Sequence, residues 1–563
     1  MVCSSECGCK AKITMLVFIP GIMGSRLKNE ESSDIVWDPA PGKGWYDSSQ
    51  MASVKARREK ELTQLQSVDD GGVFNLLKHA YNIASDAVDY AVVYVAEIPR
   101  KSWRNVSGVV SSMFHYTFLS AKERKAELAN DDKEDAFYRK KNFLSVDEGT
   151  DKYFCQKTSV PKSQVEEKRT RGWGTVLWGS YGEYLKSLQN NEQLFQNGCT
   201  GASFPVYAIG YNWMESNQAS GEHIKTKIDE FKETLAKENP DGILKSDIEV
   251  ILITHSMGGF VARSAVKLSG IESEIAYVIH GAMPTTGCPK TYQQLRTGDQ
   301  SMAKLVLGIN AAEMTAVVGF CQGALELLPN KDYTMADKTT QWLYYNNGEG
   351  ENKPLPVACG KNIYDFYCQF NRWYSMIQPA LLAPEVMADP SKTNQFDEYK
   401  KAYIKRIDEC ENYHQAFKVA GDYHNTTTAI FSTNTDNKAL DACVWHGGNK
   451  LDANKVESWQ VTDHENKSWF GDGTVELVVS KADKKISDSG GRVNSDSYTL
   501  GEPQIPGDGT VHMGLGENMP IIVNKEPIDA TEDHQNFYNC PKVRTQVNGF
   551  IQACIEDLNK KRD

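Results

Sequence analysis

Short runs of consecutive apolar residues recur along the chain, with longer amphipathic segments between them. Parallel strands have this pattern when helices cover both faces of their sheet, because no residue of such a strand faces solvent. We therefore predict buried strands at residues 13–19, 206–211, 248–253, 275–279 and 428–432. Strands that alternate with helices form crossover units, so the pattern predicts an α/β fold with a mostly parallel central sheet and helices on both faces.

Apolar residues three or four positions apart predict helices between and after these strands. Ile224, Ile228 and Leu235 share one face of the first helix, which we expect Pro240 to end. A second helix directly follows the strand at 248–253, and another, at 543–558, is the last of the sequence.

The predicted strands are unevenly spaced, so the two longest gaps must hold insertions. We expect one large catalytic domain in five parts: a first core strand with its turn (1–25), a helical insertion or cap (26–200), the central part of the core (201–295), a second helical cap or lid (296–425), and the C-terminal part of the core (426–563). Aromatic and aliphatic residues crowd the segment 363–387. This segment either forms a lid that covers a binding site or belongs to the ordinary core of the insertion.

The strand at 248–253 runs directly into a tight turn around Ser256 and then into an amphipathic helix. A nucleophilic serine at such an elbow has strained backbone angles, so the residues two positions before and after it must be small. Gly258 obeys this rule, whereas Thr254 stands where the usual pattern has glycine. We predict that Ser256 is the catalytic nucleophile and that Thr254 requires a slightly more open contact between strand and helix.

A second glycine-containing turn, at residues 20–24, follows the first predicted strand. The tetrahedral intermediate of acyl transfer carries a negative oxygen, which needs preorganised N–H donors. In α/β-hydrolases one donor belongs to the residue after the nucleophile and another to a loop after an earlier strand. We therefore predict an oxyanion hole made by the backbone N–H groups of Ile22 and Met257.

The chain order of this fold, serine then acid then histidine, selects the general base. Seven of the eleven histidines follow Ser256. We expect six of them to be polar surface or satisfied core residues, because they precede or lie within the candidate acid loops: His280, His414, His424, His446, His464 and His512. His534 remains, in a polar loop just before the last helix, and is the predicted base.

The acid has two candidates, because the motif Gly-Asp-Gly-Thr-Val occurs at residues 471–475 and again at 507–511. The aspartate must bind the second imidazole nitrogen of His534, where it fixes the tautomer and stabilises the cation. We favour Asp508, with Asp472 as the alternative, and expect the other copy to form a turn.

Charge and composition narrow the possible partners. The chain has 62 Lys and Arg residues against 74 Asp and Glu residues, a formal net charge of −12, so we expect no nucleic-acid partner. The rival interpretation of the polar loops is that their side-chain oxygens bind Ca²⁺, with four candidate ligands: Asn434, Asp436, Asp472 and Asp508. These loops, however, lack the alternating ligands of an EF-hand. We expect no metal and no organic cofactor.

The thirteen cysteines are scattered apart from Cys3, Cys7 and Cys9, which offer too few ligands for a zinc site. We expect free thiols rather than a disulfide scaffold. The most apolar helical segment, at 81–98, is interrupted by two aspartates and is not expected to span a membrane. Because the first residues lack the pattern of a secretory signal, we expect synthesis in the cytoplasm and any export by another route.

Several motifs together resemble the α/β-hydrolase lipases related to lecithin–cholesterol acyltransferase and the GPI-inositol deacylases: residues 20–25, 210–213, 254–259 and 507–511. Further segments resemble the fourth family of bacterial type VI secretion lipase effectors: 280–292, 323–330 and 533–535. The resemblance does not extend to residues 30–170. Thr254 and the doubled acid motif depart from the family pattern, and the second departure bears on the choice of Asp508.

The resemblance implies a phospholipase that acts on a membrane surface and is injected into the periplasm of a rival bacterium. It also implies a cognate immunity protein in the producing cell and a spike component of the secretion system as partners. Two alternatives stay open at this point. The first keeps the acyl chemistry: a lipid alcohol in place of water gives an acyltransferase, and a GPI anchor in place of a phospholipid gives a GPI-type deacylase. The second is a silent hydrolase fold that serves as a binding protein.

Overall fold

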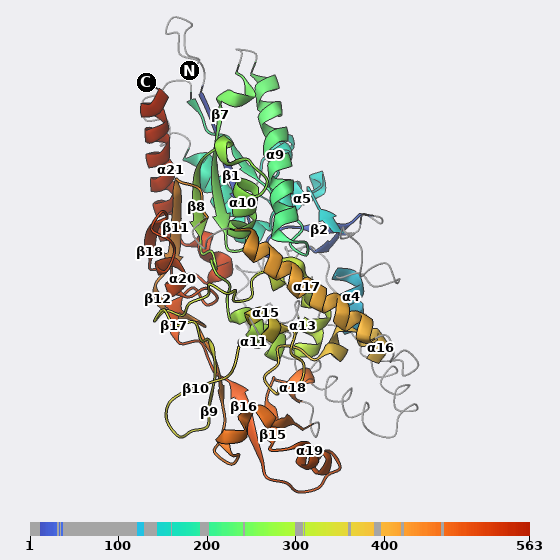
Figure 1. Ribbon diagram of the computed structural model, residues 1–563. Helices are drawn as coiled ribbons and strands as arrows, with labels where there is room; N and C mark the ends of the chain where they lie inside the picture. Colours follow the sequence, from blue (N-terminus) through green and yellow to red (C-terminus); the bar gives the residue numbers. More distant parts are fainter. Residues whose placement is uncertain are drawn as a thin grey trace, which may run out of the picture.

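The computed structural model contains a large parallel sheet, with helices on both of its faces, and a smaller second sheet (Figure 1). It describes the following residues: 12–30, 33, 35–37, 121–128, 144–158, 160–191, 202–239, 243–298, 308, 310–357, 362–387, 396–417, 422–462 and 467–562. Several residues that carry sequence predictions lie outside these ranges: Cys3, Cys7, Cys9, Pro240, His464 and the segment 81–98. No helix within the described ranges is long and apolar enough to cross a bilayer.

Seven strands form the central sheet within the described part of the chain, and all of their pairings are parallel. Their order across the sheet is β18 (Asn524–Ile528), β11 (Thr427–Ser432), β8 (Ile275–Gly281), β7 (Ile248–His255), β1 (Lys12–Ile19) and β5 (Ala202–Ser203), with β6 (Val206–Ala208) also paired to β1. The five predicted strands are therefore present, and the predicted α/β-hydrolase class with a mostly parallel sheet is confirmed.

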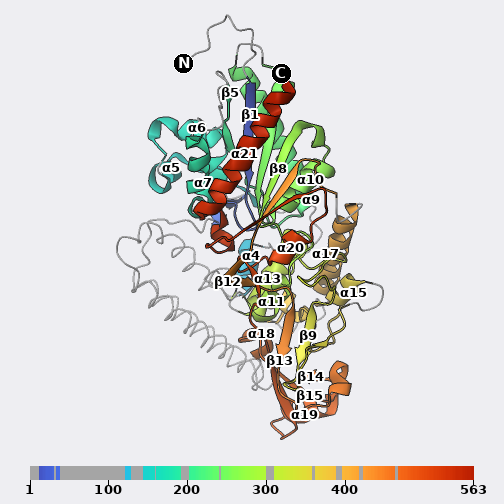
Figure 2. The same cartoon turned by 90° about the vertical axis from the view of Figure 1, so that its left-hand side faces the viewer.

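Alternate residues of the strands enter two separate cores, one on each face of the sheet. Met15 and Val17 of β1 pack in the core that contains α9 (Asn217–Glu238) and α10 (Gly258–Lys267). Leu16 and Phe18 pack instead with α7 (Trp178–Asn190) and α21 (Pro541–Arg562). Figure 2 shows α21 running across the near face of the sheet, so the side chains of the strands are apolar in both directions because both faces are covered.

The edge strand β18 was not predicted from the sequence. Its five residues, Asn524–Ile528, include a proline and two charged side chains, so they lack the apolar run of the inner strands. A strand at the edge of a sheet has only one paired side and often contains such residues, which prevent pairing with another chain.

A second sheet lies beyond the carboxyl ends of the central strands (Figure 1). Its order is β10 (Lys353–Pro354), β9 (Leu343–Asn346), β13 (Cys443–His446), β16 (Ser495–Leu500), β15 (Val475–Val478) and β14 (Gln460–Val461). We predicted only helical insertion for the part of the chain that holds β9 and β10. The strands were missed because they have six residues or fewer and half of their side chains are polar, so the apolar run is too short to recognise.

The aromatic segment 363–387 forms the core of this second unit. The side chains of Phe366, Trp373, Tyr374 and Leu382 are at most 2% exposed and pack together with residues of the second sheet. They therefore pack in the interior of the insertion, as expected if this segment belongs to its ordinary core. α17 (Phe396–Ala416) joins the two units, because its first half packs in this core and its last turns pack against the central domain.

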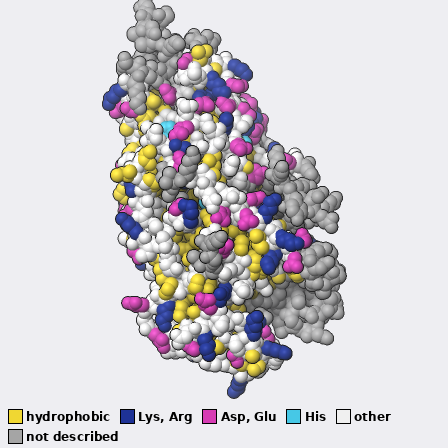
Figure 3. All heavy atoms as spheres, in the orientation of Figure 1, with side chains coloured by type: hydrophobic (Ala, Val, Ile, Leu, Met, Phe, Trp, Pro, Cys, Tyr) yellow, Lys and Arg dark blue, Asp and Glu magenta, His cyan; other side chains and the backbone are white. Residues whose placement is uncertain are grey.

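Shorter elements complete the described chain. Two small sheets pair β2 (Leu27–Asn29) with β3 (Ile35–Trp37) and β4 (Leu144–Val146), and β12 (Asn434–Ala439) with β17 (Ile505–Gly507). The remaining α-helices are α4 (Ala121–Leu128), α5 (Asp151–Lys157), α6 (Val165–Thr170), α11 (Lys290–Thr297), α13 (Ala311–Val318), α14 (Gln322–Leu325), α15 (Ile363–Tyr367), α16 (Pro384–Met387), α18 (Lys467–Phe470), α19 (Lys481–Asp488) and α20 (Met513–Glu517). On the face drawn in Figure 3, acidic and basic side chains are interspersed.

A buried carboxyl group, Glu326, connects three helices of the fold. Its Oε2 accepts hydrogen bonds of 2.8 Å from the backbone N–H and from Nδ2 of Asn217, at the start of α9. Its Oε1 accepts one of 3.2 Å from Nε2 of Gln322 in α14, and its backbone carbonyl lies 2.9 Å from Nε2 of His414 in α17. Burial raises the pKa of Glu326 to about 8, so this carboxyl group is protonated at neutral pH.

This raised pKa predicts a pH-dependent stability that Glu326→Gln removes. The unfolded chain ionises Glu326 above about pH 4.3 and the folded protein only near pH 8. The stability contributed by the protonated group is therefore complete below the lower pKa and is lost as the pH rises to the higher one. Calorimetry measures the melting temperatures of both proteins between pH 5 and pH 8. As the pH rises over this range, we expect the melting temperature of the wild type to fall relative to that of Glu326→Gln. Glu222→Gln, at an exposed position of α9, is the control, and an equal fall in all three proteins would contradict the assignment.

Candidate active site

Ser256 lies at a sharp turn between β7 and α10, with a positive φ of 52°. Its backbone N–H donates to the carbonyl of Gly281 at 2.9 Å, and its own carbonyl accepts the N–H of Gly259 at 2.9 Å. A Cβ atom on Gly258 would come within 2.4 Å of the carbonyl oxygen of Pro20, so only glycine fits there. The strained angle persists because bonds and close packing on both sides hold it, as expected for a nucleophile elbow.

Thr254, the departure from the usual elbow pattern, is accommodated by a neighbouring strand. Its Oγ1 lies 2.8 Å from Nδ1 of His280, the residue directly opposite on β8, and its carbonyl accepts a 2.8 Å hydrogen bond from Tyr538. Burial lowers the pKa of His280 to about 3, so the ring is neutral and pairs with the hydroxyl as an uncharged partner. The threonine therefore fills a polar position between two strands.

The structure brings Ser256, His534 and Asp508 together in one line. Nε2 of His534 lies 2.8 Å from Oγ of Ser256, and Nδ1 lies 2.8 Å from Oδ2 of Asp508. Asp508 is 1% exposed, Ser256 is 3% exposed and the His534 side chain is 14% exposed, so the imidazole is the member that reaches the surface. These distances lie within the range required for proton transfer from a serine to a histidine and for the hydrogen bond that joins the histidine to an acid.

Backbone donors fix the orientation of the Asp508 carboxylate. Its Oδ1 accepts the N–H groups of Thr510 at 3.0 Å and Val511 at 2.7 Å, which leaves Oδ2 for the imidazole. The backbone N–H of His534 also donates to the carbonyl of Asp508 at 2.7 Å. The acid and the histidine are therefore joined through both their side chains and their backbones.

Asp472, in the other copy of the motif, lies at a different place in the fold. It is an exposed residue of the turn that leads into β15 of the second sheet, and its Oδ1 accepts the N–H of Thr474 at 2.9 Å. Gly473 has a φ of 82° and packs against the last turn of α11. The repeated motif is a turn here, and the structure places Asp508 rather than Asp472 beside His534.

The turn that contains Ile22 packs against Ser256, and Met257 directly follows Ser256 in the chain. The turn at residues 21–24 is closed by the N–H of Gly24, which donates to the carbonyl of Gly21 at 3.0 Å, and Met23 has a φ of 58°. A Cβ on Gly21 would lie 3.0 Å from Cβ of Ser256, so the turn packs directly against the serine. Within the described ranges, no hydrogen bond uses the N–H of Ile22 or of Met257, the two predicted oxyanion donors.

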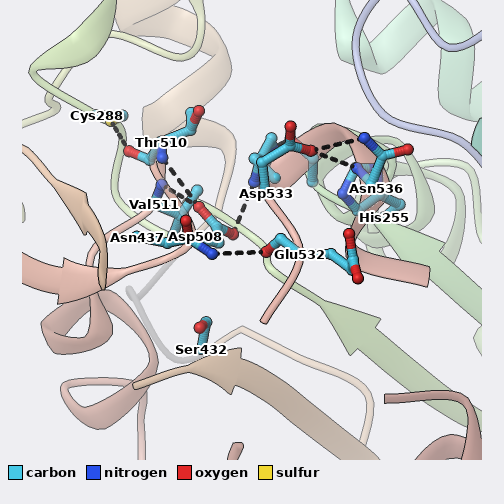
Figure 4. Close-up of polar contacts among 12 residues, drawn as sticks. His255, Cys288, Ser432, Asn437, Asp508, Thr510, Val511, Glu532, Asp533 and Asn536 are labelled. Atoms are coloured by element: carbon cyan, nitrogen blue, oxygen red, sulfur yellow. Dashed lines mark hydrogen bonds and ion pairs between the residues drawn. The ribbon is translucent and has the colours of Figure 1, made fainter. Parts of the chain in front are cut away.

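Two polar residues outside the predicted set position the loops. Asn437 donates from Nδ2 to the carbonyl of Glu532 at 3.1 Å, and its own carbonyl accepts the N–H of Gly509 at 3.2 Å, so it joins the loops of the acid and the histidine (Figure 4). Gln535 donates from Nε2 to Oγ of Ser180 in α7 at 2.7 Å. The sequence signalled Gln535 only as a neighbour of the predicted base. It gave no signal for Asn437, which lies 95 residues before its partner.

His512 and Asn434, a histidine and a candidate metal ligand from the sequence analysis, have other partners. His512 lies behind the acid loop, with Nε2 3.1 Å from the hydroxyl of Tyr333, and burial lowers its pKa to about 4. Asn434 uses Oδ1 to accept the N–H of Asp436 at 2.9 Å, in a tight turn. No group of three or more His, Cys, Asp or Glu side chains in the described parts of the chain is arranged to hold a metal ion.

A family model and a solved structure of similar fold support the assignment of the fold. Residues 227–342, which include β7, the elbow and α10, match the family of PGAP1-like alpha/beta domains. A chain in the crystal structure of the Tle4–Tli4 complex aligns with a TM-score of 0.59 and 20% identity, over 97% of this chain and 99% of that chain. Phospholipase PlaB from Legionella pneumophila aligns with a TM-score of 0.19 and 11% identity, over 53% of this chain and 81% of that chain.

None of the curated proteins matches the chain. The likeness to the chain of the Tle4–Tli4 complex extends over nearly the full length of both proteins and shows that they share a fold. The resemblance inferred from the sequence motifs is therefore confirmed at the level of the fold.

Proposed function

We propose that this chain is a serine-dependent lipase that hydrolyses the acyl esters of membrane phospholipids. The observation that carries the proposal is the line of two 2.8 Å contacts from Oγ of Ser256 through the imidazole of His534 to the carboxylate of Asp508. The strained elbow and the two N–H groups at Ile22 and Met257 support it. A silent hydrolase fold used only for binding would not need to maintain all of these features together.

In the first half of the reaction, Oγ of Ser256 attacks the ester carbonyl carbon while Nε2 of His534 takes the hydroxyl proton. Asp508 stabilises the resulting imidazolium through Nδ1. The carbonyl oxygen becomes negative and receives hydrogen bonds from the N–H groups of Ile22 and Met257. When the intermediate collapses, the proton on His534 passes to the leaving lysophospholipid oxygen, and the fatty acyl group remains on the serine.

In the second half, water replaces the departed alcohol. His534 removes a proton from this water as it attacks the acyl-enzyme, and the same two N–H groups stabilise the second oxyanion. Collapse of that intermediate returns the proton to Oγ of Ser256 and releases the free fatty acid. The site is then ready for another lipid.

The biological setting of the proposal follows from the resemblance of the motifs and from the shared fold. We place the chain among type VI secretion effectors that reach the periplasm of a rival cell, with a spike component of the secretion system as the carrier. The Tle4–Tli4 crystal structure contains a complex of two proteins. By analogy, a cognate immunity protein would bind this chain in the producing cell.

The test uses the wild-type protein with vesicles of phosphatidylethanolamine and phosphatidylglycerol. We expect release of free fatty acid, complete loss of release after treatment with a fluorophosphonate, and a label that mass spectrometry locates on Ser256. Heat-denatured protein is the control, because the reaction with the probe requires the folded site. Absence of labelling, or fatty-acid release that survives complete labelling, would contradict the proposal. Acyl transfer to an added lipid alcohol in place of water would identify a transferase instead.

A further inference from the structure

The residue before the candidate nucleophile, His255, has a buried side chain with a defined partner. The side chain is 1% exposed, and Nδ1 lies 2.9 Å from the hydroxyl oxygen of Tyr181 in α7. Its ring also packs against the ring of His534, with a distance of 4.9 Å between centroids. His255 therefore touches the candidate base without taking part in the line from Ser256 to Asp508.

Tyr181 connects His255 to the turn that carries an oxyanion donor. Its hydroxyl oxygen accepts the backbone N–H of Gly21 at 3.2 Å, and this residue comes directly before Ile22. A Cβ on Gly21 would lie 3.0 Å from Nδ1 of His255, so the turn packs against the imidazole as closely as against the serine. The N–H of Gly21 is therefore bound to Tyr181, whereas no hydrogen bond within the described ranges uses the N–H of Ile22, the predicted oxyanion donor of this turn.

Burial fixes the protonation state of both groups. It lowers the pKa of His255 well below its ordinary value, and the neighbouring imidazole of His534 acts in the same direction. It also raises the pKa of the Tyr181 hydroxyl well above its ordinary value. The phenol therefore keeps its proton and the imidazole stays neutral. We assign the phenol proton to the hydrogen bond with Nδ1 of His255, so that the ring carries its own proton on Nε2.

We propose that Tyr181 and His255 are positioning residues of the candidate active site. The chain of hydrogen bonds from Gly21 N–H through Tyr181 to His255 holds the N–H of Ile22 in place for the oxyanion. The neutral ring of His255 supports His534 from one side without a positive charge, which would oppose the imidazolium formed during the reaction. This inference rests on the proposed function, because it assigns roles only within a serine hydrolase.

The first test is Tyr181→Phe, which removes the hydroxyl and leaves the N–H of Gly21 without its partner. We expect kcat for ester hydrolysis to fall about 10- to 100-fold with an unchanged KM, less than the loss of a complete oxyanion donor. Tyr184→Phe is the matched control, because Tyr184 lies one turn away in α7, is fully buried, and its hydroxyl has no hydrogen-bond partner among the described residues. We expect this control to retain the wild-type kcat.

The second test separates hydrogen bonding from packing at His255. His255→Leu keeps most of the side-chain volume but removes the nitrogen that accepts the hydrogen bond from Tyr181. In His255→Asn, Oδ1 lies near the position of Nδ1 and is able to accept this hydrogen bond instead. We expect the leucine variant to lose as much kcat as Tyr181→Phe, and the asparagine variant to recover most of that loss. If the two residues act through one hydrogen bond, Tyr181→Phe combined with His255→Leu is no slower than either single variant.

The outcomes distinguish this inference from the proposed function. If Ser256→Ala is inactive while Tyr181→Phe has the wild-type kcat, the positioning role is wrong and the hydrolase assignment stands. If the fall in apparent kcat of Tyr181→Phe is fully explained by a smaller fraction of folded protein, its role is structural and the inference is also wrong. If Ser256→Ala remains active, both proposals fail. Labelling by a fluorophosphonate, corrected for folded protein, gives an independent measure of the same site.

Discussion

Ser256→Ala is expected to lower kcat for phospholipid hydrolysis by about a millionfold, the loss seen when the nucleophile of a serine hydrolase is removed. The substitution deletes the single oxygen that His534 activates at 2.8 Å. An alanine at the elbow keeps the backbone held by Gly281 and Gly259, so the protein is expected to fold as the wild type does. Initial rates of fatty-acid release at saturating substrate give kcat, and circular dichroism verifies the fold.

A second serine provides the control for this substitution. Ser432, labelled in Figure 4, ends β11, two strands from Ser256. Its Oγ accepts the N–H of Asn434 at 3.2 Å. Ser432→Ala removes a buried hydroxyl at the same edge of the sheet without touching His534. We expect it to change kcat by less than about tenfold, because it leaves the reacting groups in place. If Ser256→Ala keeps more than about a thousandth of the wild-type activity, the assignment of Ser256 as the nucleophile is wrong.

The central sheet was predictable because its signal is local. Each inner strand is a continuous apolar run, and the strand at β7 is followed at once by the elbow and the helix α10. The order of serine, acid and histidine then selects His534 from among several histidines. The structure places that imidazole against Ser256, although the two residues are 278 positions apart in the sequence.

The rest depends on contacts between distant segments, which no local pattern reveals. The second sheet combines strands from residues 343–354 with strands from 443–500, and each strand is short and half polar. Both a lid over a site and the core of an insertion require apolar residues, so the composition of the aromatic segment at 363–387 does not distinguish between these two roles. Tyr181 reaches His255 across 74 residues, and the elbow motif that contains His255 gives no sign of this partner.

Asp508→Asn is expected to lower kcat about ten-thousandfold, because the new side chain imposes the wrong tautomer on His534. The structure determines which way the amide must face. Oδ1 of Asp508 accepts two backbone N–H groups, from Thr510 and Val511, so the amide oxygen has to remain there. The NH₂ group then points at Nδ1 of His534, which must give up its hydrogen to accept. The proton moves to Nε2, where it blocks transfer from Ser256.

Asp472→Asn is the matched control, since it makes the same change in the second copy of the same motif. Its Oδ1 accepts a backbone N–H group from Thr474, and asparagine is able to keep this bond in an exposed turn. We therefore expect kcat and stability equal to those of the wild type. If Asp472→Asn is inactive and Asp508→Asn is not, the acid is assigned to the wrong loop. If both variants keep full activity, no carboxylate supports the imidazole, and the orientation of His534 must come from its backbone bond to residue 508 alone.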